Sequence, residues 1–229
     1  MPRKPRGVNG PARITSGAES VEFMSNTLPS EKAGIESFIV EGARITQRAL
    51  QINPWNVDGE PEQLDENSLD FRLPTKDGAQ YLDLVEFAPL GKYKGSYERV
   101  PNKHNAGEFA DALWSLVKKK SAHYGLSRRG KEHLLVYITD FRFFPSESVF
   151  SLFVAYCKRK IHGFATVAFY TPIDMESGMF RQIYPSVEGV LDLSNYDERL
   201  LRAREFTNMD MRKMRMSEDR RSAFFEPQI

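Results

Sequence analysis

The stretch LDFRLPTKDGAQYLDLVEF, residues 69–87, decides the fold of this chain of 229 residues. Its two ends are rich in apolar residues, and the polar middle contains the pair Asp77 and Gly78. Such a pair supplies the positive φ that tight hairpin turns need. The stretch therefore predicts a hairpin of two strands, at residues 69–73 and 80–87.

Outward from the hairpin, the sequence predicts alternating helices and strands. Helical spacing of apolar residues predicts helices at 31–50, 105–121 and 147–159, the first with a core-facing stripe made by Ile35, Phe38, Ile39, Gly42, Ile45 and Ala49. HLLVYITD at 133–140 and FATVAFY at 164–170 are nearly continuous in apolar residues, which is typical of strands covered on both faces. We therefore predict an α/β fold with a mixed central sheet flanked by helices.

Composition divides the chain into three parts. Residues 1–28 carry Gly, Pro and basic residues with little periodicity, and are expected to form a disordered basic arm. Residues 29–193 are expected to form the α/β core, with a short strand near 187–193. Residues 194–229 are expected to form a charged C-terminal helix and tail, in which a helix at 195–216 could bind a protein partner.

Composition and charge limit the classes of partner. Hydrophobic residues make up 41% and charged residues 28% of the chain, and the net charge is only +1. No run of about 18 apolar residues is present, so we expect a soluble, cytoplasmic protein without a membrane partner. The lone cysteine, Cys157, lies in an apolar run and is expected to be a buried structural thiol.

Three acids in the hairpin, Asp70, Asp83 and Glu86, are the best-marked candidates for chemistry. A carboxylate beside apolar strand residues loses hydration, which is costly unless a metal ion, a proton or a base compensates. Because side chains alternate along a strand, Asp83 and Glu86 face opposite sides, and we favour Glu86. Asp70 and Glu86 could hold Mg²⁺ or Mn²⁺. Alternatively, the acids form ordinary ion pairs on a solvated sheet, or a binding site without metal.

The chain resembles the PD-(D/E)xK nuclease superfamily over about residues 31–170. In that family, an Asp begins one strand, and an acid followed two residues later by Lys lies on its neighbour. Asp70 matches the first position and Glu86 the second, but Ala88 stands where the Lys is expected. The resemblance implies a restriction-endonuclease-like αβββαβ core and a metal-dependent site. Glu41 could be the first-helix acid that some members use.

The resemblance leaves the source of the lysine open. Lys94 is our candidate for the catalytic lysine, with Lys92 and Lys103 as alternatives, because some members draw the lysine from elsewhere in the chain. If no lysine approaches the acids, the resemblance implies a catalytically inactive fold.

A basic cluster follows in the second helix and its exit loop. Such a cluster can neutralise phosphates of a nucleic acid, although lysines also favour the C-terminal end of a helix on their own account. Its members are Lys118, Lys119, Lys120, Arg128, Arg129 and Lys131.

These observations lead to two functional hypotheses. The first is a nuclease-like domain that uses a metal ion to hydrolyse phosphodiester bonds of DNA or RNA. The alternative is an inactive nuclease fold that serves as a nucleic-acid or protein binding module.

Overall fold

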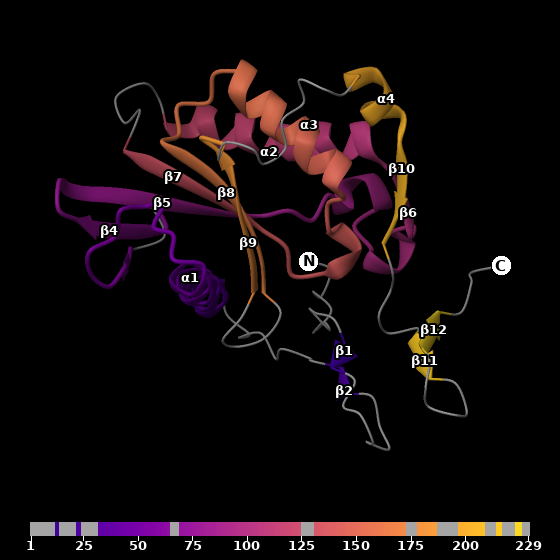
Figure 1. Cartoon of the computed structure of the whole chain (residues 1–229), viewed down its shortest axis with the longest axis horizontal. Helices are drawn as coiled ribbons and strands as arrows, with labels where there is room; N and C mark the ends of the chain where they lie inside the picture. Colours follow the sequence, from indigo (N-terminus) through magenta and orange to yellow (C-terminus); the bar gives the residue numbers. More distant parts are fainter. Residues whose placement is uncertain are drawn as a thin grey trace.

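A six-stranded mixed sheet lies between two layers of helices (Figure 1). The computed structural model describes residues 12–13, 22–23, 32–64, 69–124, 131–172, 178–186, 197–208, 214–216 and 223–225. Helix α1 (Lys32–Ala49) covers one face of the sheet, and α2 (Ala106–Tyr124) and α3 (Glu147–Arg159) cover the other. The predicted α/β class with a mixed central sheet is confirmed.

The sheet combines an antiparallel hairpin with a parallel centre. Its strands lie in the order β3, β4, β5, β7, β8 and β9, and only the pairs β5–β7 and β7–β8 are parallel. Their bounds are Glu62–Gln63, Phe71–Thr75, Gly78–Glu86, Glu132–Tyr137, Thr166–Pro172 and Gly178–Tyr184. All residues of β7 and β8 are buried, as the two apolar runs predict.

The β4–β5 hairpin turns where the sequence predicts it. Thr75 pairs with Gly78 across a two-residue turn, and Gly78 has a φ of 107°. Only glycine adopts such a φ without steric cost, so this residue fixes the turn. The turn also fixes the register of the two strands, in which Phe71 lies opposite Leu82.

Each of the three predicted helices is present. Helix α1 buries Ile35, Ile39 and Ala43 against the sheet, whereas Ala49, which the predicted stripe includes, is exposed. Helix α3 begins after Ser146, whose hydroxyl accepts a hydrogen bond from the backbone N–H of Val149 at 3.4 Å. Such a cap satisfies a backbone donor that the first turn of the helix leaves unpaired.

The segment after the sheet differs from its prediction. A single helix over 195–216 is wrong for the described residues, which form α4 (Glu198–Ala203) and β10 (Glu205–Thr207). Leu201 of α4 is buried, and β10 pairs with β6 (Lys103–Asn105). The segment therefore packs on the core as α4 and β10 instead of continuing as one solvated helix. Strand β9 also lies where the sequence pattern predicts no strand.

The remaining described elements are small. Two-stranded antiparallel pairs form between β1 (Ala12–Arg13) and β2 (Glu22–Phe23), and between β11 (Met214–Met216) and β12 (Ala223–Phe225). Three 3₁₀ helices, η1 (Leu90–Tyr93), η2 (Tyr97–Arg99) and η4 (Phe141–Phe143), lie in the connections. The predicted strand at 187–193 lies outside the described residues, as does most of the predicted arm at 1–28.

Candidate functional site

Asp70 lies beside Asp83 at the start of β4. The hairpin register continues from the pair Phe71 and Leu82, so the residue before β4 faces Asp83 on β5. Asp70 Oδ2 accepts a hydrogen bond from the backbone N–H of Leu84 at 2.6 Å, which holds its carboxylate against β5. The Asp70 carboxyl group also lies within hydrogen-bonding reach of the Asp83 carboxyl group. The two acids therefore form a contacting pair.

A lysine from another element completes this group. Lys120 Nζ on α2 donates a hydrogen bond to Asp83 Oδ1 at 2.7 Å. The Asp83 side chain is 1% exposed, whereas that of Lys120 is 28% exposed, so the ammonium connects the buried acid with the surface. Asp70, Asp83 and Lys120 are called the Asp70 cluster below.

Burial and charge make Asp83 the most perturbed acid of the cluster. Burial raises its pKa, the neighbouring Asp70 carboxyl group raises it further, and Lys120 opposes both effects, with the result that the pKa is about 7. The two carboxyl groups can hydrogen-bond to each other only when one of them holds a proton. In the ionised form, Asp83 Oδ2 is buried without a hydrogen-bond partner among the residues that the structure describes. A shared proton or a cation would compensate this oxygen.

Glu86 belongs to a different polar group, at the carboxyl end of β5. The hydroxyl of Thr139 donates a hydrogen bond to Glu86 Oε1, and Leu82 and Leu84, which share its side of the strand, pack in the core under α1. Asp83 lies under α2 instead, so the predicted separation of Asp83 and Glu86 onto opposite faces is confirmed. Among the described residues, Asp70 therefore neighbours Asp83, whereas Glu86 accepts a hydrogen bond from Thr139.

Electrostatic effects still link the two groups. The pKa of Tyr137 lies well above its ordinary value, first because the phenol is buried and then because Glu86, Glu36 and Asp70 place negative charge near it. Burial and the charge of Glu86 likewise raise the pKa of Tyr97. Tyr137 thus lies within electrostatic reach of both Glu86 and Asp70.

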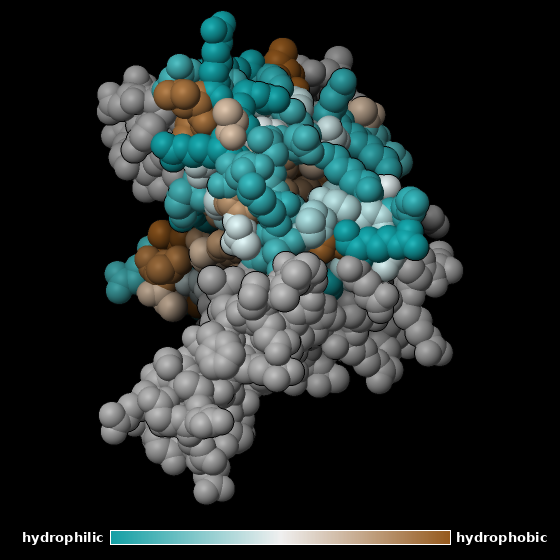
Figure 2. Space-filling model, turned by 90° about the vertical axis from the view of Figure 1, so that its right-hand side faces the viewer, coloured by the Kyte–Doolittle hydropathy of each residue, from teal (hydrophilic) through white to brown (hydrophobic). Residues whose placement is uncertain are grey.

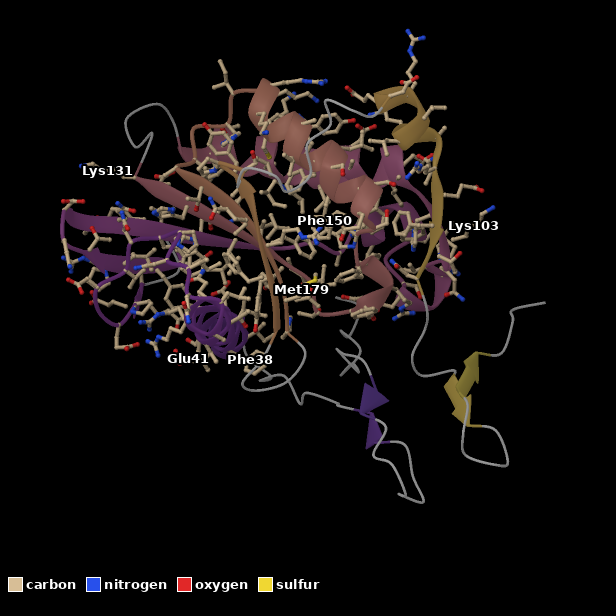
Figure 3. All side chains as sticks on the ribbon, viewed as in Figure 1. Phe38, Glu41, Lys103, Lys131, Phe150 and Met179 are labelled. Carbon is tan, nitrogen blue, oxygen red and sulfur yellow. The ribbon has the colours of Figure 1, made fainter. Side chains whose placement is uncertain are left out.

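The acid that α1 buries is Glu36. It is 6% exposed, whereas Glu41, the first-helix acid chosen from the sequence, is exposed at the surface of α1 (Figure 3). At the position where the resemblance expects the lysine, Ala88 is partly buried against the core.

Lys94 is exposed and follows η1 with a φ of 53°. It forms no ion pair with the three hairpin acids among the described residues. The lysine that the structure brings to these acids is Lys120.

The predicted basic cluster lies near the Asp70 cluster in part. Lys118 and Lys119 are exposed on α2, directly before Lys120. Lys131 is exposed at the start of β7, where its carbonyl oxygen accepts from the N–H of Tyr81, two residues before Asp83 on the neighbouring strand (Figure 3). The other two members, Arg128 and Arg129, lie outside the described residues.

Two features are absent from the residues that the structure describes. No group of three or more His, Cys, Asp or Glu side chains is arranged to hold a metal ion. The helices of the described segments also include none long and apolar enough to cross a membrane.

The sequence contains some of the signals that would predict the Asp70 cluster. A two-residue turn after Thr75 places residue 70 opposite residue 83, so the turn alone could have paired the two acids. Lys120 follows the buried Leu113 and Val117 by seven and three residues, which is the spacing of one helix face. Neither signal shows that the helix face meets the sheet at Asp83.

Comparison with known proteins adds no assignment, because no family model, curated protein or solved structure matches the chain.

Proposed function

We propose that this chain is a metal-dependent nuclease that hydrolyses phosphodiester bonds of DNA or RNA at the Asp70 cluster. The observation that carries the proposal is the buried Asp83 Oδ2, which has no hydrogen-bond partner among the described residues although the acid neighbours Asp70. A buried, ionised carboxylate with an uncompensated oxygen, beside a second acid, is costly to maintain for structure alone.

The acid pair fits a hard divalent cation. Carboxylate oxygens are the ligands that Mg²⁺ and Mn²⁺ prefer, and Asp70 and Asp83 would hold the ion between them. Bound there, such an ion would activate water and stabilise the negative charge that develops on the phosphoryl group. In this assignment Asp83 takes the place that the sequence resemblance gives to Glu86.

Other residues of the chain would place the substrate. The N–H of Leu84 fixes one oxygen of Asp70, which orients the carboxylate before any ligand arrives. The exposed Lys118, Lys119 and Lys131 would bind backbone phosphates on either side of the reacting one. This arrangement predicts binding that weakens steeply as the salt concentration rises.

The order of elements supports a restriction-endonuclease-like core. From α1, the chain continues through β3, β4 and β5, then through α2 to β7; apart from β6, which pairs with β10 outside the central sheet, this is the order αβββαβ that the resemblance implies. β3 is short, with two residues, but it pairs with β4 as the first strand of such a meander would.

The test is a cleavage assay on a panel of single- and double-stranded DNA and RNA with Mg²⁺ or Mn²⁺. We expect the wild type to cleave at least one substrate, and Asp70→Asn and Asp83→Asn to lose about a hundredfold or more of that activity. Glu62→Gln, an exposed acid on β3, is the matched control and should keep it. No cleavage by the wild type on any substrate would refute the proposal.

Glu86→Gln separates the two assignments of the second ligand. If Asp83 is the ligand, this variant loses less activity than Asp83→Asn. If it loses more, the ligand pair is Asp70 with Glu86, and the function stands with a corrected site.

The alternative is an inactive fold that binds a partner, and it also has an observation in its favour. Lys120 already neutralises Asp83, as in a structural ion pair. The side that carries α4, β10 and β6 is mainly hydrophilic with small hydrophobic patches (Figure 2). Among the exposed large apolar side chains are Leu200, which is 66% exposed, and Ile161, which is 82% exposed.

Leu200→Glu tests the alternative better than deletion of the segment, because Leu201 and Asn208 are buried in the core. Under this alternative, Leu200→Glu abolishes capture of the partner while Asp70→Asn leaves the biological assay unchanged. The nuclease proposal predicts the reverse.

A further inference from the structure

The ammonium group of Lys120 occupies a defined place relative to the acid pair. It lies 2.7 Å from Asp83 Oδ1, and Asp83 is the acid that neighbours Asp70 across the hairpin. A ligand bound between the two acids would therefore lie next to this ammonium. The lysine arrives from α2, which is far in the sequence from the hairpin.

We propose that Lys120 is the catalytic lysine of this chain and takes the role of the residue that is missing at Ala88. This inference rests on the proposed function and names the group that contacts the reacting phosphate. Lysine has three N–H donors, and Asp83 accepts from one of them. The other two are free to donate to a non-bridging phosphate oxygen and to the attacking water.

The position of Lys120 on its helix distinguishes it from its neighbours. Val117 and Leu113, on the same helix face, are fully buried, so this face lies against the sheet. Lys118 and Lys119 are exposed and reach solvent rather than Asp83. Lys120 combines a buried partner with a side chain that is 28% exposed, which lets its ammonium meet a substrate from solvent.

The positive charge of the Lys120 ammonium defines its role, which requires no net proton transfer by the lysine. The water oxygen forms the new bond to phosphorus while the bond from phosphorus to the leaving oxygen breaks. The water proton passes to solvent, and the leaving oxygen takes a proton from solvent. The Lys120 ammonium donates a hydrogen bond to the non-bridging oxygen, where negative charge grows in the transition state. Its contact with Asp83 fixes it in place beforehand.

The first experiment removes the ammonium. Lys120→Met is expected to lower the cleavage rate about 100- to 1000-fold, the effect of losing one donor to a transition-state oxyanion. Lys158→Met, an exposed lysine at the end of α3, is the matched control and should cleave as the wild type does. Mn²⁺ affinity is measured on the same samples by calorimetry. If the lysine acts on the phosphate, its removal should leave the affinity for Mn²⁺ unchanged.

The second experiment restores the ammonium and distinguishes chemistry from stability. Lys120→Cys is treated with 2-bromoethylamine, which converts the cysteine into an amine of nearly the same length as lysine. The native Cys157 is 2% exposed and burial raises its pKa to about 12, so treated wild type is a clean control. Cleavage should return to within about tenfold of the wild type after treatment.

The outcomes separate the inference from the function on which it rests. If the wild type cleaves and Lys120→Met cleaves within about threefold of it, the inference is wrong and the nuclease proposal stands. If the treated Lys120→Cys folds and binds Mn²⁺ but stays inactive, the inference is also wrong. If the wild type cleaves nothing, both fail.

Discussion

Asp83→Asn should change how the stability of the protein depends on pH. The pKa of Asp83 is raised from 3.8 to about 7, first by burial and then by the adjacent Asp70. Between about pH 4 and pH 7, folded Asp83 therefore keeps a proton that the unfolded chain has lost. The free energy of unfolding then falls as the pH rises, and this contribution becomes constant above about pH 7.

The size of the effect follows from the pKa difference. Each pKa unit corresponds to 1.36 kcal/mol, so a shift of about three units contributes about 4 kcal/mol in total. Asparagine cannot titrate, and Asp83→Asn removes the whole dependence. Other acids have the opposite sign, such as Asp111, whose pKa is lowered by its hydrogen bond with Arg202. Such distant acids contribute equally to both proteins, so the difference between wild type and variant reports on Asp83 together with its neighbour Asp70.

The assay is urea unfolding from pH 4 to pH 8.5 in EDTA, followed by tryptophan fluorescence, to which the fully buried Trp55 contributes together with Trp114. The stability of the wild type relative to Asp83→Asn should fall by about 1.4 kcal/mol per pH unit between about pH 4 and pH 7. Above pH 7.5 the difference should stay constant. A difference that does not vary with pH would show that Asp83 titrates normally, and the account of Asp83 as a buried acid beside Asp70 would be wrong.

Three further predictions concern the fold. Leu201→Ala should lower the free energy of unfolding by about 2–5 kcal/mol, because the side chain is 3% exposed. Leu200→Ala, at 66% exposure, should change it by less than about 0.5 kcal/mol. Equal effects of the two substitutions in urea unfolding would show that α4 does not pack on the core through Leu201. Gly78→Ala should lower the free energy of unfolding by more than about 1 kcal/mol, because the φ of Gly78 is 107°. Gly91→Ala should lower it by less, because a Cβ added there meets open space. A Gly78→Ala variant as stable as the wild type would contradict the hairpin turn. Cys157 should react with a thiol reagent only after unfolding, since burial raises its pKa to about 12, and rapid labelling of the native protein would show that it is accessible.

The sequence predicts the elements whose signals are local. The turn at Gly78, the buried strands β7 and β8 and the helix at 147–159 each depend on a few neighbouring residues, and each is found. The segment at 195–216 has alternating charges that suit a solvated helix. Its course depends on Leu201 packing on the core and on β10 pairing with β6, and neither contact has a local signal.

The candidate site shows the same limit. Side-chain alternation correctly places Asp83 and Glu86 on opposite faces, but it cannot tell which face holds a partner for Asp70. The apolar run before Glu86 favours that acid, whereas Asp83 is the acid that α2 buries, at 1% exposure. Lys120 stands in a run of three lysines, and only the packing of α2 on β5 singles it out.

Mn²⁺ binding tests the central claim, that Asp70 and Asp83 form a divalent cation site. The measurement is calorimetric titration of the metal-free protein at pH 8, above the pKa of about 7 that Asp83 has in the folded state. We predict one bound ion per wild-type chain and no detectable binding to Asp70→Asn. Absence of binding to the wild type, or equal binding to Asp70→Asn, would contradict the account.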